Sequence, residues 1–406
     1  MIAIPTDLIT PLAAYLRLRE EGRSSFLLES VEHGRLGRYS WLGAGSRLVD
    51  LAEAERADEP VVGYLAYDHV ATLEPTVPLP ADGPDLPESR FVVADTLVRF
   101  DHGSGVAEVL HGDAAELAER FAAAHDVEPR PAGRPSATHR FPARREYERW
   151  VRQAKEHIRA GDAFQIVLAQ RAERPTHASA VDVYRALRRV NPSPYLFLLE
   201  LDGLALVGSS PETHVKLEGR RASVNPIAGT TEPGPGDVER LLASEKDRAE
   251  HVMLVDLGRN DLSRVCRAGT VRVERMLEPE RFSHVTHLVS EVVGELRDGL
   301  DAFDLLRATF PAGTVSGAPK VRAMQIVSEL EGFRRGIYAG AIGYALPDGD
   351  LDTCIAIRTI VLRDGVAYLQ AGAGIVADSD PTAEHEECLR KLAALEAAIT
   401  LAEAEP

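Results

Sequence analysis

Two segments of the sequence place acidic side chains three residues apart. Glu384 and Glu387 have this spacing, with Lys391 four residues further on, and Asp247 and Glu250 repeat it in a second segment. If both segments are helical, each set lies on one helix face. Four carboxylates from two facing helices would form a set of oxygen ligands suited to Mg²⁺. Such pairs are more often a solvated helix face, so the spacing permits a metal site but does not require one.

Three glycine-containing segments have the composition of ligand-binding loops. They are VNPIAGTTEPG (224–234), FPAGTVSGAPK (310–320) and QAGAGIVADSDP (370–381). The first cannot continue a helix, and we expect a loop whose amides and hydroxyls surround the small residue Ala228. The second would begin a helix at residues 318–319, with Pro in its first turn and an N-terminus that favours an anion. The third places two glycines after a strand, where bare amides would bind a carboxylate, although Gly-x-Gly alone is a weak signal.

Three polar side chains follow strand-like runs, and each has two interpretations. Arg358, after the apolar run CIAI, is either a core-edge residue or a bidentate carboxylate clamp. His287 in HVTHLVSEV is a candidate site residue, but a satisfied strand histidine is the commoner case. Glu212 in GSSPE is a general acid if it is partly buried, and otherwise an exposed turn carboxylate.

Composition narrows the class of protein. The chain has 406 residues and a formal charge of −17, which argues against nucleic-acid binding. An acidic protein can still bind an anionic ligand if a divalent cation is bound at the site. Three cysteines (Cys266, Cys354 and Cys388) without CxxC spacing support neither a disulfide framework nor a zinc site. We find neither a signal-peptide pattern nor an apolar run of the ~20 residues that a membrane helix needs. We therefore expect a soluble, cytoplasmic protein.

The elements that must position these residues fall into three parts. Residues 1–125 contain short strand-like runs, including RFVVADTLVRF, and a helix at 115–125 capped by Asp113. Residues 126–145 are rich in Pro and Arg and predict a linker. Residues 146–406 alternate helices with strands that arrive consecutively, among them TCIAIRTIVL. This order predicts an α+β fold of packed, largely antiparallel sheets flanked by helices.

Many stretches of the second half match one known family in order and spacing. They are GDAFQIVLAQR, GSSPE, PIAGT, EHVMLVDLGRNDL, SHVTHLVSEVVG, FPAGTVSGAPK, YAGAIGY, CIAIRT, QAGAGIVADSDP and EHEECLRK. The region from Glu146 to the C-terminus thereby resembles the chorismate-binding enzymes, which include anthranilate, aminodeoxychorismate, isochorismate and salicylate synthases. The resemblance implies a layered fold of packed sheets and helices, with chorismate and Mg²⁺ in a cleft.

Site residues can be carried over from this resemblance position by position. It implies that Glu250 and Glu387 bind the metal directly and that Asp247 and Glu384 lie around its water shell, although the family often has Glu where Asp247 stands. It implies catalytic roles for Glu212, which would protonate the departing C4 hydroxyl, and for His287 and Thr314. The implied substrate-binding residues are Gln165, Ala228, Gly229, Thr230, Tyr338, Arg358, Gly372, Ala373, Gly374 and Lys391.

Two positions separate the family members. Isochorismate and salicylate synthases have Lys where this chain has Gln165, and glutamine cannot activate water as a base. Aminodeoxychorismate synthases commonly read PIKGT, with a nucleophilic Lys where this chain has Ala228. We therefore expect direct attack by ammonia and an anthranilate synthase large subunit. An aminodeoxychorismate synthase and a catalytically silent subunit remain the alternatives.

A partner and a regulator are also implied. The sequence contains no glutaminase cysteine motif, so a separate glutamine amidotransferase subunit would supply the ammonia. The stretches FLLESVE and NPSPYLF resemble the two segments of the tryptophan feedback pocket of anthranilate synthase, unless they are a plain strand and turn. The candidate tryptophan-binding residues are Leu28, Glu29, Ser30, Pro192, Tyr195 and Leu196.

Overall fold

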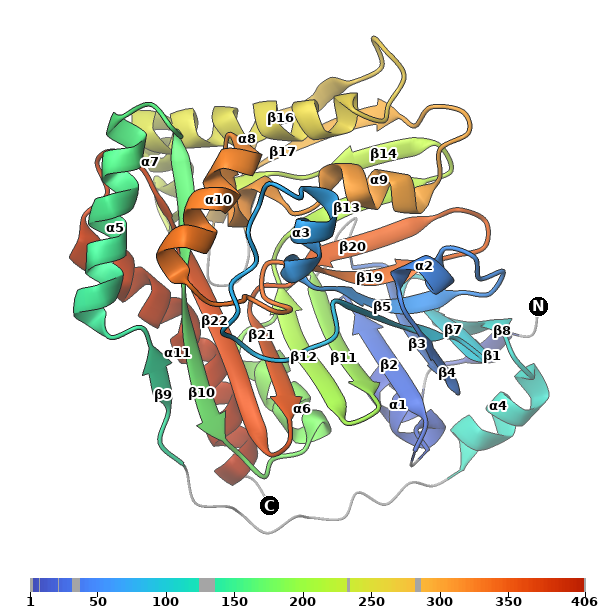
Figure 1. Cartoon of the computed structure of the whole chain (residues 1–406). Helices are drawn as coiled ribbons and strands as arrows, with labels where there is room; N and C mark the ends of the chain where they lie inside the picture. The colour runs from blue at the N-terminus through green and yellow to red at the C-terminus, as the bar shows by residue number, and fades with distance from the viewer. Residues whose placement is uncertain are drawn as a thin grey trace.

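The computed structural model describes the chain except for residues 1–2, 7, 21, 31–36, 124–135, 232–233, 282–285 and 405–406, and except for the side chains at 3, 230, 246 and 247. Within the described residues, two large antiparallel sheets pack against each other and carry helices on their outer sides (Figure 1). The predicted fold class, packed antiparallel sheets flanked by helices, is confirmed.

The first sheet combines strands from both halves of the chain. Its central pairing, β2 with β11, joins residues 24–29 to residues 195–201. The strand order is β1 (Ala3–Pro5), β8 (Val106–His111), β7 (Thr96–Asp101), β3 (Tyr39–Gly45), β2 (Ser24–Glu29), β11 (Tyr195–Leu201), β12 (Leu204–Ser210), β21 (Thr359–Arg363), β22 (Val366–Ile375), β10 (Gln165–Pro175) and β18 (Gly317–Ala318), with β9 (His139–Phe141) paired to β10.

The second sheet is built in the same way. Its pairing of β5 with β19 joins residues 61–65 to residues 341–345. The strand order is β15 (Ile227–Thr231), β17 (Thr286–Glu295), β14 (Arg221–Val224), β13 (Thr213–Glu218), β20 (Leu351–Ile355), β19 (Ala341–Ala345), β5 (Val61–Leu65), β6 (Ser89–Val93) and β4 (Arg47–Val49), with β16 (Arg272–Arg281) paired to β17. Both sheets thus cross the boundary between the predicted regions 1–125 and 146–406, and that division stays a prediction.

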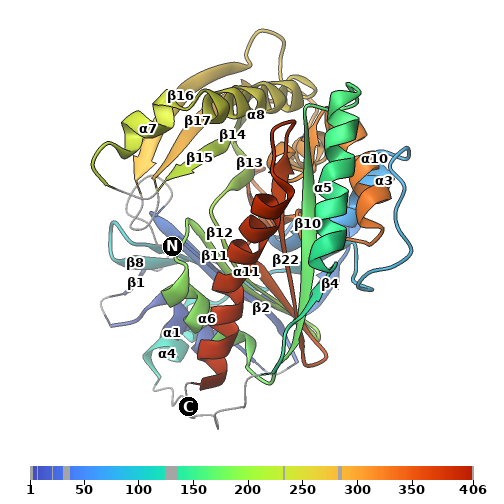
Figure 2. The same ribbon diagram turned by 90° about the vertical axis from the view of Figure 1, so that its left-hand side faces the viewer.

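Helices cover the outer faces of both sheets. In Figure 2, α11 and α5 flank β10 and β22, and α8 runs along the strands of the second sheet. The helices are α1 (Pro11–Leu18), α2 (Leu51–Ala54), α3 (Val70–Leu73), α4 (Ala114–Ala122), α5 (Arg144–Arg159), α6 (Ala180–Val190), α7 (Asp237–Ala243), α8 (Glu245–Ser263), α9 (Ala302–Thr309), α10 (Lys320–Glu331) and α11 (Pro381–Ala404), with 3₁₀ turns at Tyr67–His69 and Gly313–Val315. Among these described helices, none is long and apolar enough to cross a membrane.

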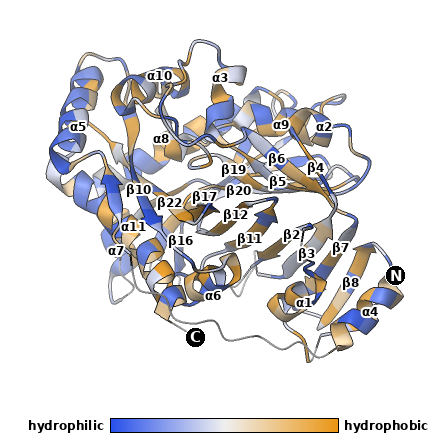
Figure 3. Ribbon diagram, turned by 60° about the horizontal axis from the view of Figure 1, so that its bottom comes forward, coloured by the Kyte–Doolittle hydropathy of each residue, from blue (hydrophilic) through white to orange (hydrophobic). Residues whose placement is uncertain are grey.

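The hydrophobic core is layered. One cluster lies between the two sheets and includes Phe26, Phe197 and Ile342, while separate clusters lie between each sheet and its helices. Figure 3 shows hydrophobic strands enclosed by helices, of which α5 is largely hydrophilic. Each fully buried large aliphatic or aromatic side chain contributes about 1.5–3 kcal/mol to the stability of the fold. Since these layers are also closely packed, they form a rigid support for a site.

Two predicted strands are wrong as single elements. RFVVADTLVRF divides into β6 in the second sheet and β7 in the first, and TCIAIRTIVL divides into β20 in the second sheet and β21 in the first. The chain crosses between sheets at residues 94–95 and 356–358, and Arg358 has a φ of 50° at its crossover. Continuous apolar runs do not reveal such a crossing, because both strands are buried on both faces.

Other boundaries differ more locally. The segment 224–234, predicted as a loop, contains strand β15, which pairs with β17 and has a register shift between Ala228 and residue 230. The helix predicted at 115–125 is α4, and Asp113 caps it as predicted by accepting hydrogen bonds from the backbone N–H groups of Ala115 and Glu116. Pro319 is the residue before α10 rather than a member of its first turn.

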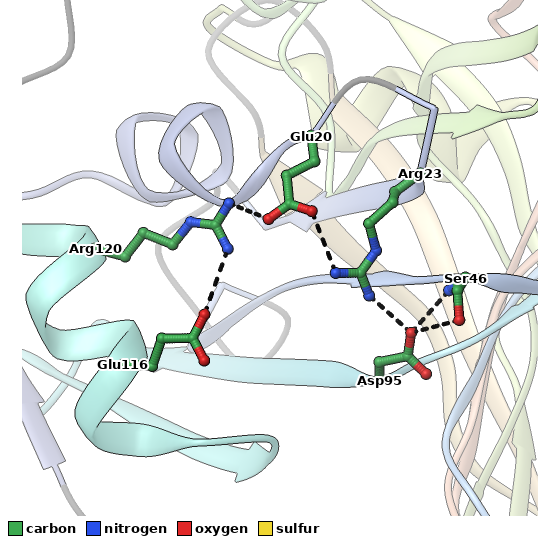
Figure 4. Close-up of polar contacts among 6 residues, drawn as sticks. All are labelled: Glu20, Arg23, Ser46, Asp95, Glu116 and Arg120. Carbon is green, nitrogen blue, oxygen red and sulfur yellow. Dashed lines mark hydrogen bonds and ion pairs between the residues drawn. The ribbon is translucent and has the colours of Figure 1, made fainter.

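A surface network holds the elements of the N-terminal region together. Figure 4 shows Arg120 of α4 bound to Glu20 and Glu116, and Arg23 bound to Glu20 and Asp95. Asp95 also accepts hydrogen bonds from the backbone N–H and hydroxyl of Ser46, at 2.8 and 2.9 Å. These groups are mostly exposed, so each ion pair contributes about 0–1 kcal/mol and the network orients the elements more than it stabilises them.

Candidate functional site

A cavity of about 240 Å³ lies where β10 and β22 of the first sheet face β15, β17 and α8. Two of the chain crossovers between the sheets, at residues 211–212 and 356–358, also reach it. Its lining contains Gln165, Val167, Pro211, Glu212, Ile227, Ala228, Glu250, Leu254, His287, Thr314, Val315, Tyr338, Ile357, Arg358, Gln370, Ala371, Gly372, Gly374, Glu387 and Lys391. Tertiary structure therefore brings together most of the predicted site residues.

A larger hollow of about 750 Å³ lies elsewhere, at the hairpin ends of the first sheet beside α1 and α6. Charged residues of both signs line it, including Arg19, Asp202 and Arg363. Its lining contains none of the predicted site residues whose side chains the structure describes. The smaller cavity is the candidate site, because it alone combines the predicted acids, cations and glycines.

Glu212 is held by hydrogen bonds between the two crossovers. Its carbonyl accepts from the Ile355 N–H at 3.0 Å, and the Ser209 N–H donates to the Arg358 carbonyl at 3.1 Å. The side chain is 8% exposed, and burial raises the pKa of the Glu212 carboxyl to about 8. The Thr314 hydroxyl, the Ile227 N–H and the Lys391 charge oppose this shift of the pKa. Glu212 therefore carries a proton at neutral pH and is able to donate it.

Thr314 projects from the 3₁₀ turn Gly313–Val315. Its hydroxyl oxygen is buried without a hydrogen bond of normal geometry to any described residue. Gly313 lets this turn approach α8, since a Cβ there would lie 2.0 Å from Leu257 Cδ2. A buried polar atom that lacks a hydrogen bond of normal geometry is costly in a folded protein, so the hydroxyl, which also interacts with the Glu212 carboxyl, is a candidate contact for a ligand.

Two cations line the same cavity. Lys391 Nζ donates to the Gly372 carbonyl at 2.8 Å and lies 2.6 Å from Glu387 Oε1. Arg358 forms no ion pair within the described part of the chain, and burial lowers the pKa of its guanidinium, while Tyr338 and Glu387 act in the opposite direction. A half-buried arginine without a counter-ion is a ready partner for a carboxylate.

The two glycines of β22 open space beside these cations. A Cβ at Gly372 would lie 2.7 Å from the Tyr338 hydroxyl, and one at Gly374 would lie 2.6 Å from Gln165 Nε2. Ala373 between them belongs to a core cluster on the opposite face that includes Trp150 of α5, and it is absent from the cavity lining, so its predicted role through the backbone amide stays a prediction. The alternation of a strand explains the difference, because adjacent residues face opposite sides.

The four predicted metal ligands do not all meet in the described structure. Glu250 and Glu387 line the cavity, and Glu250 Oε1 accepts a hydrogen bond from Gln165 Nε2 at 2.7 Å. Glu384 is buried one turn earlier in α11 and is absent from the lining, and the side chain of Asp247 lies outside the described residues. Among the residues described, no group of three or more His, Cys, Asp or Glu is close enough to hold a metal ion. Two carboxylates with several waters nevertheless match the usual protein environment of Mg²⁺, so the donor set fits this ion.

The strands β15 and β17 form the remaining wall. Ala228 is 8% exposed and lines the cavity, as does His287, whose Nδ1 lies 3.3 Å from the Gly229 carbonyl. Gly229 has a φ of 76° at the register shift and does not itself line the cavity. The side chain of Thr230 lies outside the described residues.

A buried ion pair between Arg335 and Glu331 lies behind the cavity and was not predicted from the sequence. Arg335 is 1% exposed and binds Glu331 through two hydrogen bonds of 2.6 and 2.9 Å. It also donates to the carbonyls of Val315 and Val167, both of which line the cavity. Gln370, another unpredicted lining residue, donates to the Arg335 carbonyl at 2.7 Å. The i, i+4 spacing of Glu331 and Arg335 was the available signal, but it is also typical of exposed helix pairs.

A second cavity of about 100 Å³ lies between the sheets. Five of the six residues predicted to bind tryptophan line it: Leu28, Glu29, Ser30, Tyr195 and Leu196; Pro192 does not. Its walls combine aromatic rings, such as Trp41 and Tyr344 at 4.8 Å, with the charged residues Lys216 and Asp352.

Comparisons with known proteins show the family to which the chain belongs. A model of the chorismate binding enzyme family matches residues 30–397. Anthranilate synthase component 1 of Streptomyces coelicolor is 46% identical over 98% of this chain and 88% of its own length, and that of Thermus thermophilus is 43% identical over 98% and 97%. The crystal structure of anthranilate synthase component I from Streptococcus pneumoniae has a TM-score of 0.80 and 33% identity, covering 97% of this chain and 98% of the other.

Proposed function

Because the chain belongs to the chorismate-binding enzymes, we propose that it is the large subunit of an anthranilate synthase, which converts chorismate and ammonia into anthranilate and pyruvate. The observation that carries the proposal is one cavity holding a protonated Glu212 together with the cations Arg358 and Lys391. Relatives named anthranilate synthase component 1 support it over nearly the whole chain.

The charges of the cavity match those of chorismate, which carries two carboxylates. Arg358, with Tyr338 and the backbone beside Gly372, is placed to bind the enolpyruvyl carboxylate. Lys391, which lines the same cavity and donates to the Gly372 carbonyl, is proposed to bind the ring carboxylate. Binding both carboxylates fixes the ring in one orientation, and this orientation presents its C4 hydroxyl to Glu212.

Glu212 supplies the proton that the first step needs. The C4 oxygen leaves as water when it takes the Glu212 proton, while the ring electrons shift and ammonia forms a bond to C2. The C2–H and C3–O bonds of this amino intermediate then break, the enolpyruvyl group takes up a proton and leaves as pyruvate, and the new C2–C3 double bond makes the ring aromatic. Raising the pKa of Glu212 to about 8 keeps the acid protonated at the start of each turnover.

Gln165 and Ala228 decide which nucleophile attacks. The amide of Gln165 donates to Glu250 and cannot take a proton from water. Ala228 lines the cavity without a nucleophilic atom. The space beside C2 is therefore left for ammonia itself, and a partner glutamine amidotransferase would supply it in the cell.

We also propose that Glu250 and Glu387 bind Mg²⁺, which when bound would neutralise the ring carboxylate and help to hold its charge. Glu387→Gln is expected to raise the Mg²⁺ concentration for half-maximal activity about 10- to 100-fold, because an amide oxygen carries no charge. Glu386→Gln, on an exposed neighbour in α11, is the matched control. Calorimetric titration with MgCl₂ checks the same change without turnover, and equal affinities in both variants would contradict the assignment.

Gly372→Ala tests the substrate cradle. Its Cβ would lie 2.7 Å from the Tyr338 hydroxyl and 2.9 Å from the Leu168 carbonyl, so Tyr338 must shift. We expect kcat/KM for chorismate to fall about 10- to 100-fold, since small misplacements of binding groups are costly. Gly234→Ala is the control, because its Cβ would meet no described atom within 4 Å. Similar kinetics in the two variants would remove Gly372 from the cradle.

The proposed activity is tested with the purified chain, chorismate, MgCl₂ and an ammonium salt at alkaline pH. Anthranilate fluorescence and pyruvate release are followed together, and equal amounts of both are expected. Glutamine in place of ammonium should give no turnover without the partner subunit. Chorismate consumed without pyruvate would mean that the reaction stops at an amino intermediate, and binding without turnover would mean a silent subunit; either outcome would overturn the proposal.

The second cavity is proposed to bind tryptophan as a feedback inhibitor. Its aromatic walls suit an indole ring, and its acidic and basic side chains suit the ammonium and carboxylate of an amino acid. The five predicted residues that line it support this assignment.

A further inference from the structure

The two cavities are joined by the chain crossover between β12 and β13. Glu212 lines the catalytic cavity, and Tyr195 lines the second one. The residue after Glu212 is Thr213, which is 6% exposed. The Thr213 hydroxyl contacts Tyr195, and Thr213 is absent from the lining of the catalytic cavity.

The contact is part of a hydrogen-bonded bridge between the sheets. The Tyr195 hydroxyl, from the first sheet, donates to Asp352 Oδ1 at 3.1 Å, in the second sheet. Its oxygen lies 2.8 Å from Thr213 Oγ1. Because the phenol proton is used toward the carboxylate, the Thr213 hydroxyl donates to Tyr195. Thr213 is thus tied to the wall of the second cavity by its side chain.

A backbone hydrogen bond connects Glu212 to the strand that carries Asp352. The Glu212 carbonyl accepts from Ile355 N–H at 3.0 Å, and Ile355 ends the strand β20 that also carries Asp352. Glu212 is therefore held by two groups, the side chain of the adjacent Thr213 and the backbone of β20. The first contacts Tyr195 and the second carries Asp352, and both of these residues line the second cavity. A shift of Tyr195 or Asp352 must be absorbed at this crossover, because the packed sheets on either side are rigid.

We propose that Thr213 is a positioning residue that transmits occupancy of the second cavity to Glu212. The inference rests on the proposed function, and it concerns how an inhibitor bound in the second cavity acts on that site. The ammonium group of an aromatic amino acid competes with Tyr195 for Asp352. The Tyr195 hydroxyl then turns, its bond with Thr213 breaks, and the Glu212 carboxyl leaves the position from which it reaches the substrate. Binding and inhibition are therefore separable at Thr213.

The test compares Thr213→Val, which removes the hydroxyl at constant shape, with Thr213→Ser, which restores it. L-tryptophan affinity is measured by calorimetry, and the activity remaining at saturating L-tryptophan is measured with chorismate and ammonium. For Thr213→Val we expect an unchanged affinity but at least about fivefold less inhibition, within the usual range of allosteric coupling. Its uninhibited kcat should fall while KM stays the same, since Glu212 acts only in the transition state. Thr213→Ser should restore both properties.

Several outcomes would overturn the inference. Full inhibition of Thr213→Val at unchanged affinity would show that the signal bypasses this hydroxyl, and loss of tryptophan binding would make Thr213 a binding residue instead. A wild-type chain that makes anthranilate but neither binds L-tryptophan nor is inhibited by it would overturn the inference and leave the proposed activity intact. If Thr213→Val does not fold, Tyr195→Phe removes the same hydrogen bond from the other side. It should also lose inhibition more than it loses affinity, and equal losses of both would count against the proposal.

Discussion

Glu212→Gln is expected to lower kcat about 10²- to 10⁴-fold with little change in KM, because the amide keeps the shape of the acid but has no proton to give. In the unaltered protein the pKa of Glu212 is raised to about 8. An acid works in its protonated form, so kcat should be constant below pH 7 and decline as pH rises through about 8. The variant should lack this decline.

The measurement needs a constant supply of nucleophile. Un-ionised ammonia increases with pH, so total ammonium must be adjusted to hold the free base constant across the profile. Glu218→Gln, at the exposed end of β13, the strand that follows Glu212, serves as the control and should keep both the rate and the decline. A Glu212→Gln profile that still declines near pH 8 would assign that titration to another group.

The same pKa shift predicts a gain in stability for this variant. The unfolded chain ionises Glu212 around the ordinary glutamate pKa of 4.5, whereas the folded chain keeps the proton until about pH 8. Between these values the unfolded state binds fewer protons, so the free energy of unfolding decreases as pH rises. Glu212→Gln removes this penalty, on the order of a few kcal/mol at pH 8. An inactive variant that is more stable than the parent cannot be explained by misfolding.

Arg335→Met is expected to lower the free energy of unfolding by about 3–5 kcal/mol, more than any other substitution proposed for this protein. The reason is that it leaves the Glu331 carboxylate buried and without its cation. Both side chains are 1% exposed. Glu331 Oε1 also accepts from the Ala169 N–H at 2.7 Å, and the Arg335 guanidinium lies 4.8 Å from the Tyr67 ring centroid. Urea unfolding followed by circular dichroism measures the loss.

The double variant Arg335→Met with Glu331→Leu separates the two sources of that loss. If the unpaired charge dominates, removing it as well should recover a large part of the stability, so the two changes should be far from additive. Arg390→Met, on an exposed position of α11, is the control and should change stability by less than about 0.5 kcal/mol. Additive losses would mean that Arg335 stabilises by packing. In that case the candidate cavity would depend on the Arg335–Glu331 ion pair less than the contacts of Arg335 with Val315 and Val167 suggest.

The sequence predicted the residues of the site more accurately than the strands that carry them. Twelve of the predicted site residues line the candidate site: Gln165, Glu212, Ala228, Glu250, His287, Thr314, Tyr338, Arg358, Gly372, Gly374, Glu387 and Lys391. Short motifs with local chemistry can be matched one position at a time, which is why these residues were found. Ala373 is absent from that lining, and its predicted role through the backbone stays a prediction.

The amino-acid sequence by itself determined the chemistry available to this protein: which acids, cations, glycines and amides exist, and that neither Gln165 nor Ala228 can serve as base or nucleophile. Side-chain chemistry belongs to the residue type and needs no fold to be known. Tertiary structure alone decided how that chemistry is tuned. Burial at a crossover between two sheets raises the pKa of Glu212, and the same crossover ties Thr213 to a second cavity. Both effects depend on dielectric surroundings and on contacts between residues distant in sequence, such as Glu212 and Ile355, which no local pattern contains.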